Sequence, residues 1–600
     1  MKREPTGGFK VNQLRPVGDV ADVIALSVLA HKLDSIAEEM GATMRKSSHS
    51  PIFAEANDFA CSVTNGEGEQ IAQLAGIPII GAAGGFGPTE VLREFPLEEI
   101  HQGDVFLMND AYRLGNHLPE LTVVLPVFIR GELLFFTVAR AHHHDVGGPT
   151  PGSMNARHNS IFAEGIRIPP VKLFERDKVN KPLVDTIKLN VRDPEVLWSD
   201  LMAEIGACRI GQQRLQETLE RRYSNHDIRR ITSAILDMSE RQCRDAIRQL
   251  PNGTYRAEYG MDNDGLNNDP VYFRVAVTVN DDDIVVDYTG TDPQAEGAKN
   301  CTQATTYSGT NVAVLWALSG GIPRNSGSFR PIKIIAPEGT LVNPRAPAAV
   351  GMCTLPPACA MMGAVLKALG QSDPKRVPAG FFSVFTAGYG GIDPRTNKLF
   401  IGWCFGALGG GGGYPHRDGD SFVAPISNYN GILVPNIETD EVNFPIKTLR
   451  HEYIPDTGGA GRNRGGNGVE YTIQFRGVSP DVSVFGDGVV IPAFGLAGGA
   501  SGSLNEGFLN RGREDGKTLL SNEGWNRCRD GDTLTVLAAG GGGWGDPLDR
   551  DFNAVLHDIL DGMVSVAAAR DSYGVVVRDG SVDADATAAL RLDLRAKRAA

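Results

Sequence analysis

The sequence predicts an α+β fold made of several β-rich units with packed helices. Glycine and proline are abundant, at 72 and 35 residues, which favours many turns and strands over a helical bundle. Segments with helical spacing of apolar residues also alternate with segments of strand-like alternation. Because 600 residues exceed what one compact core holds, we expect a multi-domain chain.

The expected units follow the changes in pattern along the chain. An N-terminal α+β unit with a candidate metal site is expected at 1–195, and a helical hairpin at 196–252. A central α+β unit follows at 253–380, then a glycine-rich β unit at 381–550 and a helical segment at 551–600.

The individual elements are predicted from periodicity and turn residues. Apolar residues at helical spacing predict a helix over 20–44, and two longer helices over 197–221 and 227–248. β-branched and aromatic runs at 121–129 and 133–140, separated by Arg130-Gly131, predict a β-hairpin. We expect further strands over 255–289, and helices at 310–318, 358–369 and 551–563. The end of the chain, 587–600, has the composition of a charged helix or a frayed tail.

The segment 382–539 is rich in glycine and has turn signals about every ten residues, which favours a β-sandwich or barrel-like unit. Within it and just beyond lie the glycine runs 409–413 and 540–543. No convincing helix follows either run in a dinucleotide-binding pattern, so we interpret both as tight loops.

Composition excludes several classes of function. The net charge of −14 weighs against a nucleic-acid partner, because phosphate binding needs clustered Lys and Arg. The eight cysteines form no CxxC pair, so neither a disulfide framework nor a structural zinc site is expected. No apolar run follows the polar N-terminus, and none reaches the roughly 20 residues that span a bilayer. These features predict a cytoplasmic protein without a membrane segment.

The predicted hairpin carries the residues with the clearest chemistry. With a two-residue turn at Arg130-Gly131, His142 lies opposite Pro119, within two residues of His117 and Glu120. The three side chains can then lie within roughly 8 Å of one another. Two imidazoles and a carboxylate suit a divalent metal such as zinc or manganese, and an open coordination position would make the site catalytic. The alternative is a polar strand end that binds nothing.

Other acidic and basic residues nearby are candidates for supporting roles. Asp145 could orient a metal-bound imidazole, and either Asp145 or His143 could move protons. Glu55 or Asp58 could supply another carboxylate ligand. The alternative for these two is a capped turn that leads into a strand beginning at Phe59.

Long motifs throughout the chain resemble the signature of the hydantoinase B/oxoprolinase family. The motifs are 103–110, His117-Leu-Pro-Glu120, 142–148, 162–172, 325–332, 336–339, 456–466 and 540–550. The resemblance implies a small-molecule enzyme in which a hydantoinase A-type, ATP-binding partner phosphorylates the substrate oxygen. It also implies a hetero-oligomer in which the chain of the present type holds a divalent metal: zinc, manganese or iron. The family's ligands fall on His117, Glu120 and His142, with a further acid at Asp58 or Glu55.

The implied reaction is hydrolysis of a cyclic amide, such as a lactam or hydantoin, because the His-Leu-Pro-Glu form is most similar to the hydantoinase branch. A ketone carboxylase of the acetone or acetophenone type is the alternative, and a non-catalytic scaffold subunit is the second alternative. Three departures from the family pattern keep the scaffold hypothesis open. Glu120 stands in place of Asp, Ile80 in place of His, and Leu114-Gly115-Asn116 in place of Gly-Gly-Thr.

Overall fold

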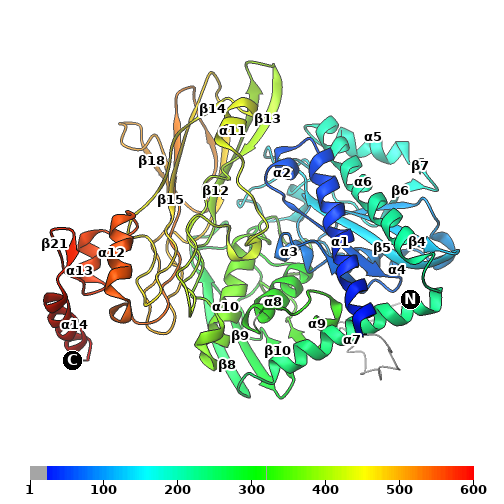
Figure 1. Cartoon of the computed structure of the whole chain (residues 1–600). Coiled ribbons are helices and arrows are strands. Elements are labelled where there is room, and N and C mark those ends of the chain that lie inside the picture. Colours follow the sequence, from blue (N-terminus) through cyan, green and yellow to red (C-terminus); the bar gives the residue numbers. More distant parts are fainter. Residues whose placement is uncertain (1–22, 319, 600) are drawn as a thin grey trace.

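The computed structural model describes residues 23–318 and 320–599, which form helices and several β-sheets in successive units. In Figure 1 the N-terminal unit lies on the right, the glycine-rich β unit beside it on the left and the central unit at the lower centre, and the C-terminal helices lie beyond the β unit. The predicted α+β class with several β-rich units is confirmed.

A seven-stranded antiparallel sheet organises the N-terminal unit, in the order β2-β1-β5-β4-β3-β6-β7. Its strands are β1 (Phe59–Asn65), β2 (Gln70–Gln73), β3 (Val105–Met108), β4 (Glu120–Ile129), β5 (Glu132–His142), β6 (Val171–Glu175) and β7 (Lys178–Val179). Short helices connect them: α2 (Pro51–Ala54), α3 (Pro78–Gly81), α4 (Phe86–Glu94) and α5 (Lys181–Leu189).

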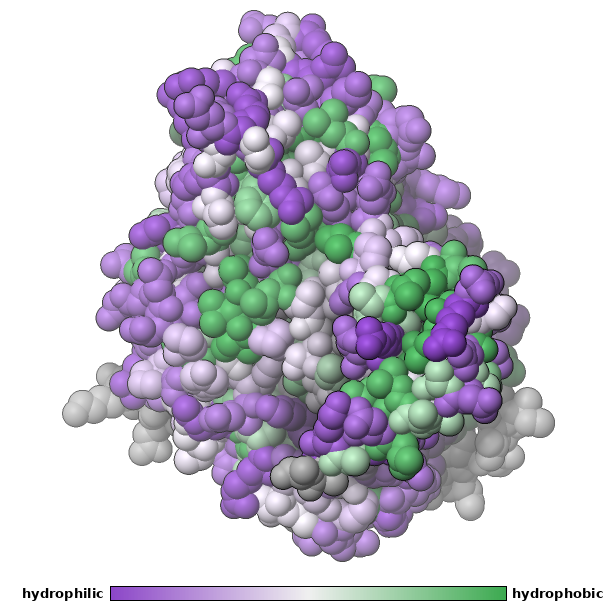
Figure 2. Space-filling model, turned by 90° about the vertical axis from the view of Figure 1, so that its left-hand side faces the viewer, coloured by the Kyte–Doolittle hydropathy of each residue, from purple (hydrophilic) through white to green (hydrophobic). Residues whose placement is uncertain are grey.

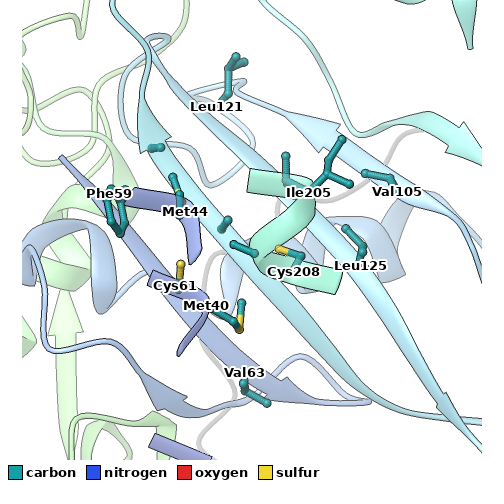
Figure 3. Close-up of a cluster of buried hydrophobic side chains, with 14 of the residues drawn as sticks. Met40, Met44, Phe59, Cys61, Val63, Val105, Leu121, Leu125, Ile205 and Cys208 are labelled. Carbon is teal, nitrogen blue, oxygen red and sulfur yellow. The ribbon is translucent and has the colours of Figure 1, made fainter. Parts of the chain in front are cut away.

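One face of this sheet is covered by helices α1 (Val23–Ser47) and α6 (Pro194–Leu219). Met40 and Met44 of α1 and Ile205 of α6 pack against side chains of β1 and β4 (Figure 3). Successive side chains in a strand point to opposite faces, so alternate residues of β1, β4 and β5 are committed to this core. The predicted helix 20–44 is α1, although residues 20–22 lie outside the described part.

The two long helices predicted next are also present. They face different neighbours: α6 packs mainly on α1 and the hairpin strands, whereas α7 (Asn225–Ile247) packs mainly on the short helix α9 (Ser326–Phe329).

The predicted hairpin is confirmed, but its predicted register is wrong by one residue. Arg130 and Gly131 form the turn with φ of 48° and 79°, the left-handed conformation that two-residue hairpin turns use. Ile129 pairs with Glu132 as predicted. A bulge then shifts the ladder, so that Val127 pairs with Phe135 and Glu120, not Pro119, lies opposite His142.

The central unit is a four-stranded sheet, in the order β11-β10-β9-β8, packed against two buried helices. Its elements are β8 (Gly253–Met261), β9 (Val271–Asn280), β10 (Asp283–Asp287), β11 (Ile332–Ile335), α8 (Gln303–Ala317) and α10 (Pro356–Ser372). The strands β8, β9 and β10 correspond to those expected over 255–289, and α8 and α10 overlap the helices expected at 310–318 and 358–369, whereas β11 was not predicted.

Two antiparallel sheets of the β unit share one hydrophobic core, as in a sandwich. The first is β13-β12-β16-β19, comprising β12 (Phe385–Asp393), β13 (Lys398–Trp403), β16 (Asp481–Gly486) and β19 (Gly524–Arg527). The second is β14-β15-β20-β17-β18, comprising β14 (Ile446–Tyr453), β15 (Val469–Phe475), β17 (Glu506–Leu509), β18 (Lys517–Leu519) and β20 (Thr533–Leu537). Helix α11 (Ile437–Asn443) packs on β14.

The glycine runs below these sheets are not the tight loops that we predicted. They are extended segments hydrogen-bonded side by side: the Gly466 amide donates to the Gly411 carbonyl, and the Gly541 amide donates to the Gly466 carbonyl. A Cβ on Gly466 would lie 2.0 Å from the carbonyl oxygen of Asp420. Only glycine allows backbones to approach this closely, so these residues form an interior layer of main chain.

The C-terminal unit contains α12 (Phe552–Leu560), α13 (Val566–Asp571), α14 (Ala584–Ala599) and the ribbon of β21 (Val577–Arg578) and β22 (Ser581–Val582). Helix α14 shows that the charged end of the chain is helical. Leu560 and Leu592 are exposed, and Figure 2, which views the molecule from this end, shows hydrophobic patches set among hydrophilic side chains. None of the helices within 23–599 combines the length and apolarity needed to cross a bilayer.

Candidate metal centre

Two carboxylate side chains, of Asp58 and Glu120, and the imidazole of His142 lie in one row across adjacent strands. Glu120 of β4 pairs with His142 of β5, and the His142 amide donates to the Asp58 carbonyl at 3.0 Å, just before β1 begins. Their neighbours Phe59, Leu121 and Ala141 are buried in the core beneath α1 and α6. Because side chains alternate between faces, Asp58, His142 and Glu120 belong to the opposite face of the sheet.

His117 reaches the same point from the turn that precedes β4. The Glu120 amide donates to the His117 carbonyl at 3.0 Å, which brings the two side chains together. The His117 Nε2 atom lies 3.1 Å from Glu120 Oε1 and 3.1 Å from His142 Nδ1. Each of the three residues offers one possible ligand atom, and these atoms all lie within 4.8 Å of one another. All three side chains are buried.

The orientation of the His117 ring is fixed from the central unit. His117 Nδ1 lies 2.9 Å from the carbonyl oxygen of Gly351, which can only accept, so Nδ1 carries the proton. In the neutral ring the lone pair on Nε2 then faces the Glu120 carboxylate. A lone pair and a carboxylate oxygen 3.1 Å apart repel each other unless a cation or a proton lies between them.

The pKa values of His117, His142 and Asp58 reflect the need for a positive charge between the His117 ring and the Glu120 carboxylate. Burial would lower the pKa of His117, but Glu120, the Gly351 carbonyl and Asp58 together raise it. Burial and the neighbouring histidines hold the pKa of His142 well below its usual value, so this ring is neutral. Burial and the charge of Glu120 raise the pKa of Asp58 to about 7, against the opposing effect of His117.

These residues fit a divalent metal ion. Ligand atoms bonded at about 2.1 Å around one ion stand roughly 3.0–3.4 Å apart in tetrahedral or octahedral geometry, and the two separations of 3.1 Å match this. Neutral imidazole nitrogens with a carboxylate oxygen are the donor set that zinc and manganese accept. Asp58 lines the same cavity and adds a second carboxylate.

Asn116 is a contributor that the sequence analysis missed. Its amide nitrogen donates to Glu120 Oε2 at 2.7 Å, which leaves Oε1 directed toward His117, and its own oxygen accepts from Thr305 at 3.3 Å. In the sequence, Asn116 stands out only as a departure from the family pattern. Asn116 and Glu120 both differ from the family pattern, and the hydrogen bond between them gives Asn116 a physical role.

The structure separates Glu55 from Asp58, which the spacing of the sequence could not do. Glu55 caps the C-terminal end of α2, and its charge acts on Asp440. Asp58 lines the cavity at the cluster and Glu55 does not. The geometry therefore brings Asp58, and not Glu55, to the candidate ligands.

His143 and Asp145 lie outside the cavity, so the proton-transfer role expected of them does not fit their contacts. His143 is one residue along the strand from His142 and points toward α6, where its Nε2 lies 2.6 Å from Glu204 Oε1. Asp145 accepts hydrogen bonds from the amides of Gly147, Gly152 and Arg192 and pairs with the Arg192 guanidinium. Both residues hold the backbone that carries His142.

The cavity that opens at the cluster lies where three units meet. The candidate ligands come from the N-terminal sheet, Thr354 and Leu355 from the central unit, and Val384, Trp403 and Phe485 from the β unit. The Trp403 ring packs edge-on to His142 with centroids 6.2 Å apart. A mostly apolar cavity lined by a few converging polar side chains is typical of a ligand-binding site.

The fold and this site define a multi-unit protein with a candidate metal centre. Comparison with known proteins identifies its family. Residues 22–547 match the family described as hydantoinase B/oxoprolinase, and the chain belongs to this family. It is 32% identical to the caprolactamase beta subunit of Pseudomonas jessenii over 96% of this chain and 99% of that one. It is 30% identical to the B-type chain of a putative D-/L-hydantoinase of a Pseudomonas species over 95% and 98%.

Solved structures agree with this assignment. The ATP-dependent caprolactamase of Pseudomonas jessenii superimposes with a TM-score of 0.89 at 30% identity, covering 96% of this chain and 100% of that one. A nucleotide-free acetone carboxylase superimposes with a TM-score of 0.87 at 23% identity, covering 96% and 83%, which shows a shared fold.

Proposed function

We propose that this chain is the metal-binding subunit of an ATP-dependent enzyme that hydrolyses a cyclic amide. A hydantoinase A-type partner would bind ATP and phosphorylate the substrate oxygen, in a hetero-oligomer with this chain. Similarity along the full length to the beta subunit of a caprolactamase and to the B-type chain of a hydantoinase supports both the reaction and the partner.

The observation that carries the proposal is the convergence of His117, Glu120 and His142 in the lining of one cavity. With Asp58 they would hold one divalent ion: zinc, manganese or iron. The bound ion would supply Lewis acidity to the substrate oxygen and lower the pKa of a water molecule.

The chain's own residues would prepare the site. Gly351 fixes the tautomer of His117, and Asn116 fixes the carboxylate of Glu120, so both present a lone pair to the same point. The lining is mostly apolar, and it would strengthen polar interactions in the cavity wherever a bound substrate displaces water.

The test is reconstitution of the chain with its co-purifying ATP-binding partner. We expect ATP hydrolysis that depends on a cyclic amide, releases the ring-opened product and needs no bicarbonate. His117→Ala and His142→Ala variants should lose both the metal and the activity.

Two outcomes would favour the other candidates. A strict requirement for bicarbonate would support a ketone carboxylase, a reaction carried by the fold shared with acetone carboxylase. Full activity of a metal-free complex would support a scaffold role for this chain.

A further inference from the structure

The Gly351 carbonyl that meets His117 belongs to a short main-chain segment of the central unit, 347–351, and hydrogen bonds set the position of this segment. The Tyr112 hydroxyl donates to its second carbonyl at 2.8 Å, and the Asn300 side chain donates to its third carbonyl at 2.9 Å. These two contacts fix the first half of the segment. Its last two residues, which carry the carbonyl toward His117, are held by a third side chain.

That side chain is Glu164 of the N-terminal unit. Glu164 follows the 3₁₀ helix η2 (Ile161–Ala163), and its side chain is fully buried. Its Oε1 atom accepts from the Val350 amide at 2.6 Å and from the Gly351 amide at 2.7 Å. Both distances are short for N–H···O bonds, as expected for an acceptor that carries a charge. One buried carboxylate therefore holds the two amides just before the carbonyl that meets His117.

The Glu164 carboxylate is turned toward this segment and not toward the cavity. His158 Nε2 lies 3.0 Å from the same Oε1 atom, whereas Oε2 is buried and has no hydrogen-bond partner within the described residues. The Ile161 amide donates to the Pro347 carbonyl at 3.0 Å, which ties the backbone before Glu164 to the same segment. Glu164 does not line the cavity, so it is not a candidate ligand, and its effect on the cluster passes through Gly351.

From these contacts we infer that Glu164 is a positioning residue for the candidate metal ligand His117, and that it acts through the main chain of Gly351. The inference rests on the metal-binding part of the proposed function. The Gly351 carbonyl keeps the proton of His117 on Nδ1, which leaves the Nε2 lone pair for the ion. Without Glu164, two buried amides lose their acceptor, and the segment must shift to satisfy them. The carbonyl would then no longer hold the imidazole in its orientation and tautomer.

The test uses three variants of the full chain loaded with cobalt(II), an ion whose visible spectrum reports the geometry of its ligands. Glu164→Ala removes the acceptor and should weaken cobalt binding at least about 10-fold, with an altered spectrum. Glu164→Gln keeps an oxygen for both amides, so its affinity should stay within about threefold of the wild type, with the wild-type spectrum. Glu164→Asp should lose affinity, because its shorter side chain cannot reach both amides. If the alanine variant fails to fold, the contrast between the aspartate and glutamine variants decides the matter.

Asp262→Ala is the matched control. Asp262 is also a buried carboxylate that accepts from main-chain amides, those of Val489, Val490 and Ile491, and it does not line the cavity. Both Asp262→Ala and Glu164→Ala should lower the midpoint of thermal unfolding, because each leaves buried amides without an acceptor. Only Glu164→Ala should change the cobalt affinity and spectrum. The contrast separates the positioning of a ligand from a general loss of stability.

The outcomes separate this inference from the proposed function. A wild-type chain that binds no cobalt would overturn both. If the wild type binds cobalt and Glu164→Ala keeps its affinity and spectrum, the inference alone fails. Equal losses of affinity in Glu164→Ala and Asp262→Ala, or a glutamine variant as weak as the alanine variant, would also overturn the inference alone. If the affinities fall as expected but the reconstituted complex hydrolyses no cyclic amide, the proposed reaction fails and the inference stands.

Discussion

Glu120 and His142 lie directly opposite each other across the β4–β5 hairpin. The bulge between Val127 and Phe128 creates this pairing, because without it His142 would face Pro119. Opposite residues on one face of a sheet have their Cβ atoms within about 5.5 Å. The bulge therefore turns two side chains that would only be near each other into a pair that one ion can bridge.

Asn116 should contribute to metal affinity without touching the ion. Replacing it with alanine removes the 2.7 Å hydrogen bond that orients the Glu120 carboxylate. Loss of such a supporting contact typically weakens metal binding about 10–100-fold. Competition with a coloured chelator measures the change. Asn553→Ala, on the exposed surface of α12, is the control, and equal affinities in the two variants would contradict the assigned role.

The pair formed by His143 and Glu204 should matter for stability and not for metal binding. Burial raises the pKa of Glu204 well above its usual value and lowers that of His143 to about 3, so a protonated Glu204 donates to a neutral imidazole. Glu204→Gln keeps a donor at this position, whereas Glu204→Ala leaves His143 unsatisfied and should cost about 1–3 kcal/mol more. Chemical denaturation measures the difference. Loss of metal from the Gln variant would place this pair in the site after all.

The sequence alone predicts the hairpin, the long helices and the three residues His117, Glu120 and His142, because these depend on local periodicity and spacing. It does not predict the bulge, since an extra residue in a run of apolar side chains leaves no trace in the pattern. Nor does it predict the contact of Gly351 with His117, which joins residues of separate units. The sequence predicts the strand that begins at Phe59 but cannot choose between Glu55 and Asp58, because only the folded chain shows that Asp58 lines the cavity.

The glycine layer illustrates the same limit, and it gives a sharp prediction. Each run has the local pattern of a loop, because its partners lie far away in the chain. Gly466→Ala should destabilise the protein by more than about 4 kcal/mol or prevent folding, since the added Cβ would lie 2.0 Å from the Asp420 carbonyl oxygen. Gly206→Ala in α6 meets no atom within 4 Å and should stabilise it by up to about 1 kcal/mol. Thermal melts of both variants test the contrast, and a mild effect at Gly466 would refute the close packing.

Asp440 should make stability depend on pH. Burial and the charge of Glu55 raise the pKa of Asp440 to about 7, above the ordinary 3.8 of an unfolded chain. The folded state thus holds a proton that the unfolded state releases, and stability falls as pH rises from about 4 through 7. The Asp440→Asn variant lacks this titration and keeps its stability as pH rises. The free energy of unfolding of the variant relative to wild type should therefore increase by about 2 kcal/mol between pH 5 and pH 8. An offset that does not change with pH would show that Asp440 titrates normally.

The central claim is that His117, Glu120 and His142 hold one divalent ion, and metal analysis of the purified chain tests it most directly. Mass spectrometry of the elements should find one zinc, manganese or iron per chain in the wild type. The same content is expected in His226→Ala, a control at an exposed histidine of α7. The His142→Ala variant should be folded and metal-free. A folded His142→Ala variant that retains the full metal content would contradict the account, as would a wild-type chain that is active in its complex without any metal.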